Sequence, residues 1–311
     1  MKLESAFRWA KFVLPIVVLV LAAIYLWKTF EPAALGDAVA QLDWVQLVWI
    51  SVPLILLVFA IRTARWWWLL ADLGARGTNV LRLYFAISMT VGLAAITPMQ
   101  SGEAFKIWLA RREMKAGLAE VSALHILERL LDVIVLAALT FIALLVSPGS
   151  QLSVIGLLGL SVLLALVGLA AFHERIGSFL PSFVYTGLRS IMQALRRPKH
   201  LIVLVLITLS GWVVTTGLWA FAFQSAGVGA FAPATLITIV GLVTFATIFS
   251  FLPGGIGVSE ASAAALLLAA GSSPEIALAG ALALRMIGVM TVLLGAVFWG
   301  VRQIWPTQSS S

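Results

Sequence analysis

Two glutamate–arginine combinations stand out because all four side chains lie in otherwise apolar sequence. Glu103 precedes Arg129 by 26 residues, and Glu260 precedes Arg285 by 25 residues. A charge at the centre of a bilayer costs at least about 2.5 to 3.5 kcal/mol, so each side chain should be paired or face a polar cavity. Two kinds of chemistry are open to them. The pairs can join neighbouring segments as ion pairs, or the arginines can bind an anion while the carboxylates compete for them or carry a proton.

Each glutamate lies where proline and glycine interrupt an apolar segment. The first interruption contains Pro98, Gly102 and Glu103. The second contains Glu260 together with one proline and three glycines, which are Pro253, Gly254, Gly255 and Gly257. Unwound backbone at membrane depth is tolerated where it lines a cavity, and its N–H groups can hold an anion. Matching interruptions in two halves therefore indicate the binding site of a transporter, with these residues at its tips.

Further polar residues follow the first interruption. His125, Glu128, Arg129 and Asp132 are spaced i, i+3, i+4 and i+7, so they share roughly one face of a helix, which must look inward. An interior hydrogen-bonded cluster is favoured over a metal site because no second histidine stands at ligand spacing. A proton relay through His125 stays open.

We expect no metal and no cofactor, and we expect the substrate to be bound by charged side chains. For two of them, Arg62 and Arg65, snorkelling to the membrane interface is an equally good interpretation. The full set of expected substrate-binding residues is Arg129, Arg285, Glu103, Glu260, Asp132, Glu128, Lys106, Arg62 and Arg65.

The composition identifies the environment in which these residues must be positioned. Of the 311 residues, 62% are hydrophobic and only 11% are charged, against about 25% charged in soluble domains. The chain is therefore predicted to lie in a membrane. It has no cysteine, which excludes disulfides, thiolate metal sites and a cysteine nucleophile. The net charge of +7 does not indicate nucleic acid as a partner, because the basic residues fall in short loops between apolar runs.

The apolar runs predict an all-α polytopic membrane protein with six spanning helices. The predicted spans are 12–30, 44–66, 119–146, 152–172, 201–224 and 276–300. Two segments remain. Segment 83–110 has arginines on both flanks and should enter and leave from the cytoplasm, whereas segment 233–270 has no Lys or Arg on either flank and should enter from outside. Both are therefore predicted to be re-entrant hairpins of opposite orientation, with both chain termini cytoplasmic.

The order span, hairpin, span occurs twice within a single membrane domain, 1–311. The first repeat covers 44–146 and the second, inverted with respect to it, covers 201–300. Residues 173–200 form a basic cytoplasmic linker, for which an interfacial helix is favoured over a plain loop. The run Arg65-Trp66-Trp67-Trp68 is interpreted as an anchor at the cytoplasmic interface.

Four ordered motifs together resemble a known family. They are Arg62-x-x-Arg65-Trp66, Pro98-x-x-x-Gly102-Glu103-x-x-Lys106, Glu128-Arg129-x-x-Asp132 and Pro253-Gly254-Gly255-Ile256-Gly257-x-x-Glu260. This set looks like the lysylphosphatidylglycerol synthase transmembrane-region family, which is the flippase half of the bacterial multiple peptide resistance factor. The resemblance implies a lipid translocase in the inner (cytoplasmic) membrane, and it is also the sole basis for considering a homodimer. Since the sequence ends at Ser311, we expect a stand-alone member without the aminoacyl-transfer domain.

The expected function is therefore a lipid flippase. A polar, phosphate-bearing headgroup would cross through a midplane cavity between the two repeats, and membrane lipids would be the partners. Two alternatives remain: a secondary transporter of a small hydrophilic anion, and an intramembrane enzyme or membrane partner of a lipid-modifying enzyme.

Overall fold

A computed structural model describes residues 36–37, 40, 42–71, 79–97, 100–114, 117–146, 198–250 and 252–304. The predicted spans 12–30 and 152–172, most of the linker 173–200, and Pro98 lie outside these residues. The chain divides into two compact units, which are described separately. Unit 1 comprises residues within 1–55, 92–102 and 216–293, and unit 2 comprises residues within 56–91, 103–215 and 294–311.

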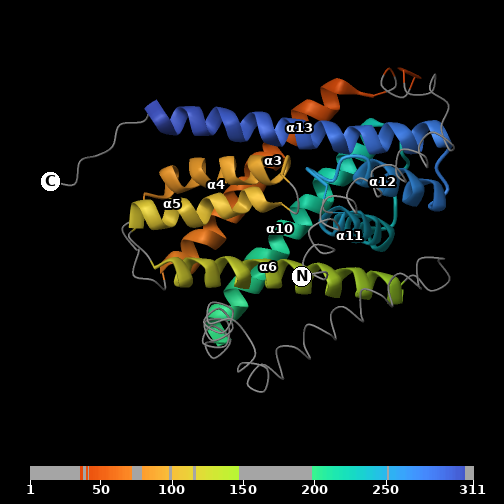
Figure 1. The fold of residues 1–311 in the computed structure, drawn as a ribbon. Coiled ribbons are helices and arrows are strands. Elements are labelled where there is room, and N and C mark those ends of the chain that lie inside the picture. Colours follow the sequence, from red (N-terminus) through yellow and green to blue (C-terminus); the bar gives the residue numbers. More distant parts are fainter. Residues whose placement is uncertain are drawn as a thin grey trace, which may run out of the picture. The chain divides into compact units, whose positions relative to one another are not determined.

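Four long helices are apolar enough to cross a membrane (Figure 1). They are α3 (Trp44–Ala71), α6 (Leu118–Val146), α10 (Pro198–Ser225) and α13 (Pro274–Ile304). The shortest have 28 residues, which corresponds to about 42 Å of helix against about 30 Å of hydrocarbon. Four of the six predicted spans are thereby confirmed as spanning candidates, and the described residues contain helices but no β-strand.

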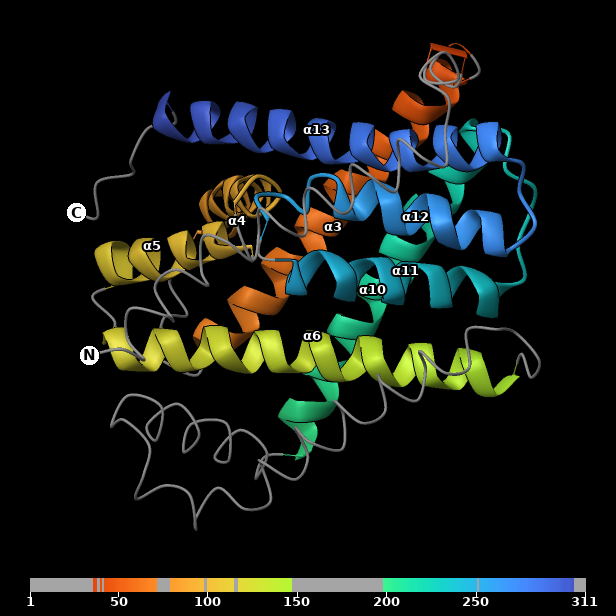
Figure 2. The same cartoon turned by 45° about the vertical axis from the view of Figure 1, so that its right-hand side comes forward.

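The two remaining apolar segments are each broken where the sequence predicts. In the first, α4 (Val80–Ala94) is followed by a turn, the 3₁₀-helix η1 (Ser101–Ala104) and α5 (Phe105–Met114). In the second, α11 (Pro233–Phe249) and α12 (Val258–Ala269) are separated by a glycine-rich turn. Figures 1 and 2 show α11 and α12 side by side. We call the two turns the first break (residues 95–103) and the second break (residues 250–257).

Within unit 1 the two breaks contact each other through backbone. Gly254, at φ 57°, donates its N–H to the carbonyl oxygen of Thr97 at 3.4 Å. A Cβ on Gly254 would overlap the carbonyl oxygen of Ala95. Glycine is therefore required here twice, by the left-handed backbone and by the close approach of the first break.

In unit 2 the core forms where α3, α4, α5, α6 and α10 bring large apolar side chains together. Trp66, Leu83, Leu127 and Leu204 belong to this core. Trp66 is 1% exposed, so its interpretation as an interface anchor is wrong: its indole lies inside the protein.

The last turns of α13 pack on both arms of the first broken segment, within unit 2. The ring of Phe298 stacks on Phe85 of α4 at 5.5 Å between centroids, and that of Trp299 meets Phe105 of α5 edge-on at 5.3 Å. Arg302 donates from Nε to the carbonyl oxygen of Arg82 at 3.3 Å. The last turns of α13 therefore contact the first turns of α4 and the first residue of α5, which follows the first break.

Substitution Gly254→Ala tests the contact between the breaks. The new methyl would combine a strained φ with a clash against backbone, so we expect a loss of about 1 to 3 kcal/mol. Thermal unfolding in detergent would show a lowered Tm. The control is Gly229→Ala, where an added Cβ meets nothing within 4 Å. Equal Tm values for the two variants would contradict the inferred requirement for glycine at position 254.

Candidate functional site

Unit 2 contains a group of seven charged side chains, which we call the ion cluster. Its members are Arg62, Arg65, Glu103, Lys106, Glu128, Arg129 and Asp132. They come from α3, η1, α5 and α6. Five of them were predicted from the sequence as charges that should be paired or face a polar cavity, whereas for Arg62 and Arg65 snorkelling to the interface was an equally good interpretation.

Glu103 is the point at which three elements join. Its Oε1 accepts from Arg62 at 2.7 Å, and its Oε2 lies 3.0 Å from Lys106 Nζ and 2.8 Å from Arg129. The predicted pair of Glu103 and Arg129 is thereby confirmed. The carboxylate is 2% exposed. Three cations around one buried carboxylate satisfy the rule that buried charges must be paired.

Glu128 and Asp132 pair with the other members of the cluster. Arg65 lies 2.6 Å from Glu128 and 2.5 Å from Asp132, and it is only 3% exposed. Snorkelling of Arg65 to the interface is therefore wrong. Lys106 also forms an ion pair with Glu128, and its ammonium lies 4.9 Å from the centre of the Trp66 ring. This cation–π contact gives a physical reason for the burial of Trp66.

The cluster carries more positive than negative charge. Four cations against three carboxylates leave a net charge of +1 on these seven side chains. The side chains of Arg62 and Arg129 are each 28% exposed, whereas those of Lys106 and Arg65 are 4% exposed. The two outer arginines are thus the most exposed cations of the cluster.

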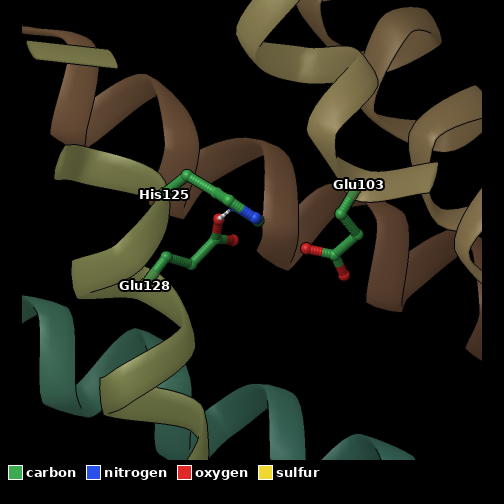
Figure 3. A group of neighbouring side chains, drawn as sticks. All are labelled: Glu103, His125 and Glu128. Carbon is green, nitrogen blue, oxygen red and sulfur yellow. Dashed lines mark ion pairs between the residues drawn. The ribbon is translucent and has the colours of Figure 1, made fainter. Parts of the chain in front are cut away.

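His125 lies beside the cluster and raises the question of a metal. Ligand atoms of Glu103, His125 and Glu128 all lie within 4.8 Å of one another. Figure 3 shows Glu103 opposite His125 and Glu128, with His125 Nδ1 3.8 Å from Glu128. Lys106 already contacts both carboxylates, so a metal ion would have to displace its ammonium. This donor set fits a lysine better than a metal, and the proton relay through His125 stays a prediction.

The second predicted pair, Glu260 with Arg285, is formed within unit 1. Arg285 donates from Nε to Glu260, from Nη2 to the Ser259 hydroxyl at 3.1 Å and from Nη1 to the Gly254 carbonyl at 3.4 Å. Arg285 thereby connects α13 to the second break and to the first turn of α12.

Glu260 also caps the N-terminus of α12. Its Oε2 accepts from the backbone N–H of Gly257 and from the Ser259 hydroxyl, both at 2.8 Å. Glu260 is the third residue of the helix, where a carboxylate satisfies a free N–H and interacts favourably with the helix dipole. Both oxygens of Glu260 are thus engaged inside the protein.

Arg285 faces a cavity of about 230 Å³ in unit 1. Residues of both breaks line it, including Thr97 and Gln100 from the first and Gly254 and Gly255 from the second. Ser259 and Arg285 also line it, so two of the predicted tip residues, Gly254 and Gly255, meet one predicted arginine at this cavity, while Gly102, Pro253 and Gly257 do not line it.

Most lining residues were not predicted as site residues, among them two threonines and a tryptophan. Thr244 and Thr247 come from α11, and Trp219 comes from α10. The threonines stand three residues apart in an apolar helix just before the second break, which is the signal that could have identified them.

The comparison with known proteins decides the family. The model of the lysylphosphatidylglycerol synthase TM region matches residues 12–295. The chain belongs to this family. No curated protein matches the chain. As a member of the lysylphosphatidylglycerol synthase TM region family with four candidate spans, it is a multi-pass membrane protein. The matched family is the membrane region, not a catalytic domain.

Substitution Glu128→Gln tests the ion cluster. It leaves Arg65 and Lys106 short of a buried counter-charge, and breaking a buried network of this kind costs about 3 to 5 kcal/mol. We expect a clearly lower Tm in detergent. Glu120→Gln, on an exposed position of the same helix, should melt like the parent protein. Unchanged melting of Glu128→Gln would show that the cluster contributes little to stability.

Proposed function

We propose that the protein is a lipid translocase that moves a polar, phosphate-bearing headgroup between the two leaflets. The observation that carries the proposal is the cavity at Arg285, which is lined by both breaks, in a chain of a lipid-related membrane family. Broken helices that meet at a cavity are the usual construction of a transporter's substrate site.

The donors of Arg285 suit a phosphate. A guanidinium has five N–H donors, and the three bonds of Arg285 use one on each nitrogen. Two donors are then available to a ligand, one on each terminal nitrogen. A phosphodiester presents two equivalent oxygens, which two N–H groups can bind together.

The size of the cavity suits a headgroup and not a whole lipid. Sites for drug-sized ligands have about 300 to 1,000 Å³, so about 230 Å³ holds a small polar group. Acyl chains would stay in the bilayer while the headgroup crosses. This division keeps the apolar tails in hydrocarbon and limits the cost of crossing to the polar group.

The matching depth of the two arginines supports a repeat, and the charges that flank the two broken segments support its inversion. Arg129 follows the first residue of α6 by 11 positions, and Arg285 follows the first residue of α13 by 11 positions. At 1.5 Å per residue both lie about 16 Å along their helices, near the middle of a bilayer. We therefore propose six spans, two oppositely oriented re-entrant hairpins, and alternating access by movement of one repeat against the other. Arg62 and Arg129 would provide a second contact for an anionic headgroup.

One alternative uses the same cavity. A free phosphate-sized anion would fit about 230 Å³ and could bind the same two donors. The chemistry shared by both functions is recognition of an anionic oxygen group by Arg285, and a transport assay must distinguish lipid from solute.

Arg285→Ala should abolish lipid translocation. The protein is reconstituted in vesicles that contain a fluorescent phospholipid, and the rate at which the probe moves between the two leaflets is measured. This rate should fall at least about tenfold, because the headgroup loses its hydrogen bonds to the guanidinium. Arg285→Lys should retain part of the rate, since it keeps the charge without the fork. Arg111→Ala, an exposed arginine, is the matched control. Normal lipid movement in Arg285→Ala would reject the assignment. Uptake of phosphate without lipid movement would favour the alternative.

The orientation of the hairpins can be measured directly because the chain has no cysteine. Single cysteines at Val80 and Arg111 flank the first broken segment, and cysteines at Ala230 and Ser273 flank the second. All four positions are exposed. With a membrane-impermeant maleimide, we expect the first two to react from one side and the last two from the other. Reaction of Val80 and Arg111 from opposite sides would show that the first segment crosses the membrane.

A further inference from the structure

We infer that Gly288 sets the size of the group that the cavity at Arg285 admits. It lies in α13, three residues after Arg285, and it lines the cavity without a side chain. Because this assignment rests on the proposed translocase function, Gly288 acts as a specificity-determining residue of the same transport. The glycine keeps space open beside the arginine, and any side chain in its place would take that space from the ligand.

Neither backbone conformation nor close packing requires glycine at position 288. The residue lies inside a regular helix, and its φ is not among the positive values found at Gly254 and Gly255. A Cβ placed on Gly288 would meet no atom within 4 Å. Gly280 of the same helix shows the opposite case, since its Cβ would lie 2.7 Å from the side chain of Leu267. The space beside Gly288 is therefore open.

A glycine at such a position makes the helix less stable than alanine would. Glycine loses more conformational entropy on folding, so alanine is the better residue in a helix interior wherever a methyl group fits. A methyl group fits at position 288, and what glycine provides there is room in the cavity. Glycine is also common in membrane helices for other reasons. Gly300 of α13 represents that case, because its Cβ would likewise meet nothing and it does not line the cavity.

A side chain at position 288 would extend toward the part of the cavity that Arg285 lines. Side chains of a helix lean toward its N-terminus, and residues three or four positions apart share a face. A side chain at 288 would therefore lie over Leu284 and Arg285, which line the same cavity. The cavity measures only about 230 Å³, which is below the size of sites for drug-sized ligands, so even a methyl group there competes with the ligand for space.

The first experiment uses two probes of equal charge and different size, acyl-labelled phosphatidylglycerol and the smaller phosphatidylmethanol. Translocation is measured in vesicles, and binding to the purified full chain by native mass spectrometry. Gly288→Ala should weaken both for phosphatidylglycerol at least about tenfold and for phosphatidylmethanol less than about threefold, as one added methyl group in a confined site allows. Gly300→Ala is the matched control and should change neither. Both alanine variants should have a Tm equal to or above that of the parent protein.

The second experiment adds bulk after the protein has folded, so a folding defect cannot imitate the effect. Because the chain has no cysteine, Gly288→Cys introduces a single thiol at the cavity. Treatment of the reconstituted variant with N-ethylmaleimide, verified by intact mass, should lower the translocation rate of both lipids at least about tenfold, since overpacking of a confined site is unfavourable. The same treatment of Gly300→Cys should leave the rate unchanged.

The outcomes separate the role of Gly288 from the proposed function. Parent-like binding and translocation in Gly288→Ala and in the modified Gly288→Cys, while Arg285→Ala abolishes translocation, would overturn the role of Gly288 and leave the translocase intact. Binding that depends on size and on position 288, without translocation in the parent protein, would overturn the proposed function and support the size limit. A lowered Tm of Gly288→Ala alone would show that packing requires the glycine, and it would overturn the inferred role. Absence of binding and translocation in the parent protein would overturn both.

Discussion

The cost of placing charge in a membrane determines how the described part of this chain is built. In unit 2, the carboxylates of Glu103, Glu128 and Asp132 are paired with four cations. In unit 1, Glu260 is paired with Arg285. A carboxylate in hydrocarbon would be unstable, so each acid fixes the position of the helix that supplies its partner. The breaks exist at these places because unwound backbone and charged side chains need the same shielded environment.

Similar spacing of glutamate and arginine in the two halves leads to two different arrangements. Glu103 is surrounded by three cations and contacts α3, α5 and α6, so it holds helices together. Glu260 has one cation and uses its other oxygen to cap α12. Arg129 is thus shared among acids, while Arg285 lines a cavity and makes three hydrogen bonds with its five donors. The physical cause of the difference is the number of cations near each glutamate, which cannot be deduced from the glutamate–arginine spacing alone.

Much of the described fold and of the candidate site was predictable from the sequence, because these features follow from local sequence rules. The breaks follow from proline and glycine, the four described spans from apolar length, and the two ion pairs from the need to neutralise charge at membrane depth. The partners of Arg65 were not predictable, since Glu128 and Asp132 lie more than 60 positions away and only the packing of α3 on α6 brings them together. The burial of Trp66 has the same origin. The threonines of the cavity gave little signal because a hydroxyl bonded to its own helix is compatible with any apolar span.

The engagement of both Glu260 oxygens bears on how a headgroup could be released. If the carboxylate competed with the ligand for Arg285, each cycle would have to break the cap of α12 or move a proton to the acid. The bonds at Arg285 make neither step necessary, because two donors stay available while Glu260 holds the side chain in place. Binding and release can then follow from access to the cavity alone, which is compatible with passive movement of lipid. Any coupling to protons would have to act elsewhere, for example at His125, which lies 3.8 Å from Glu128 in unit 2.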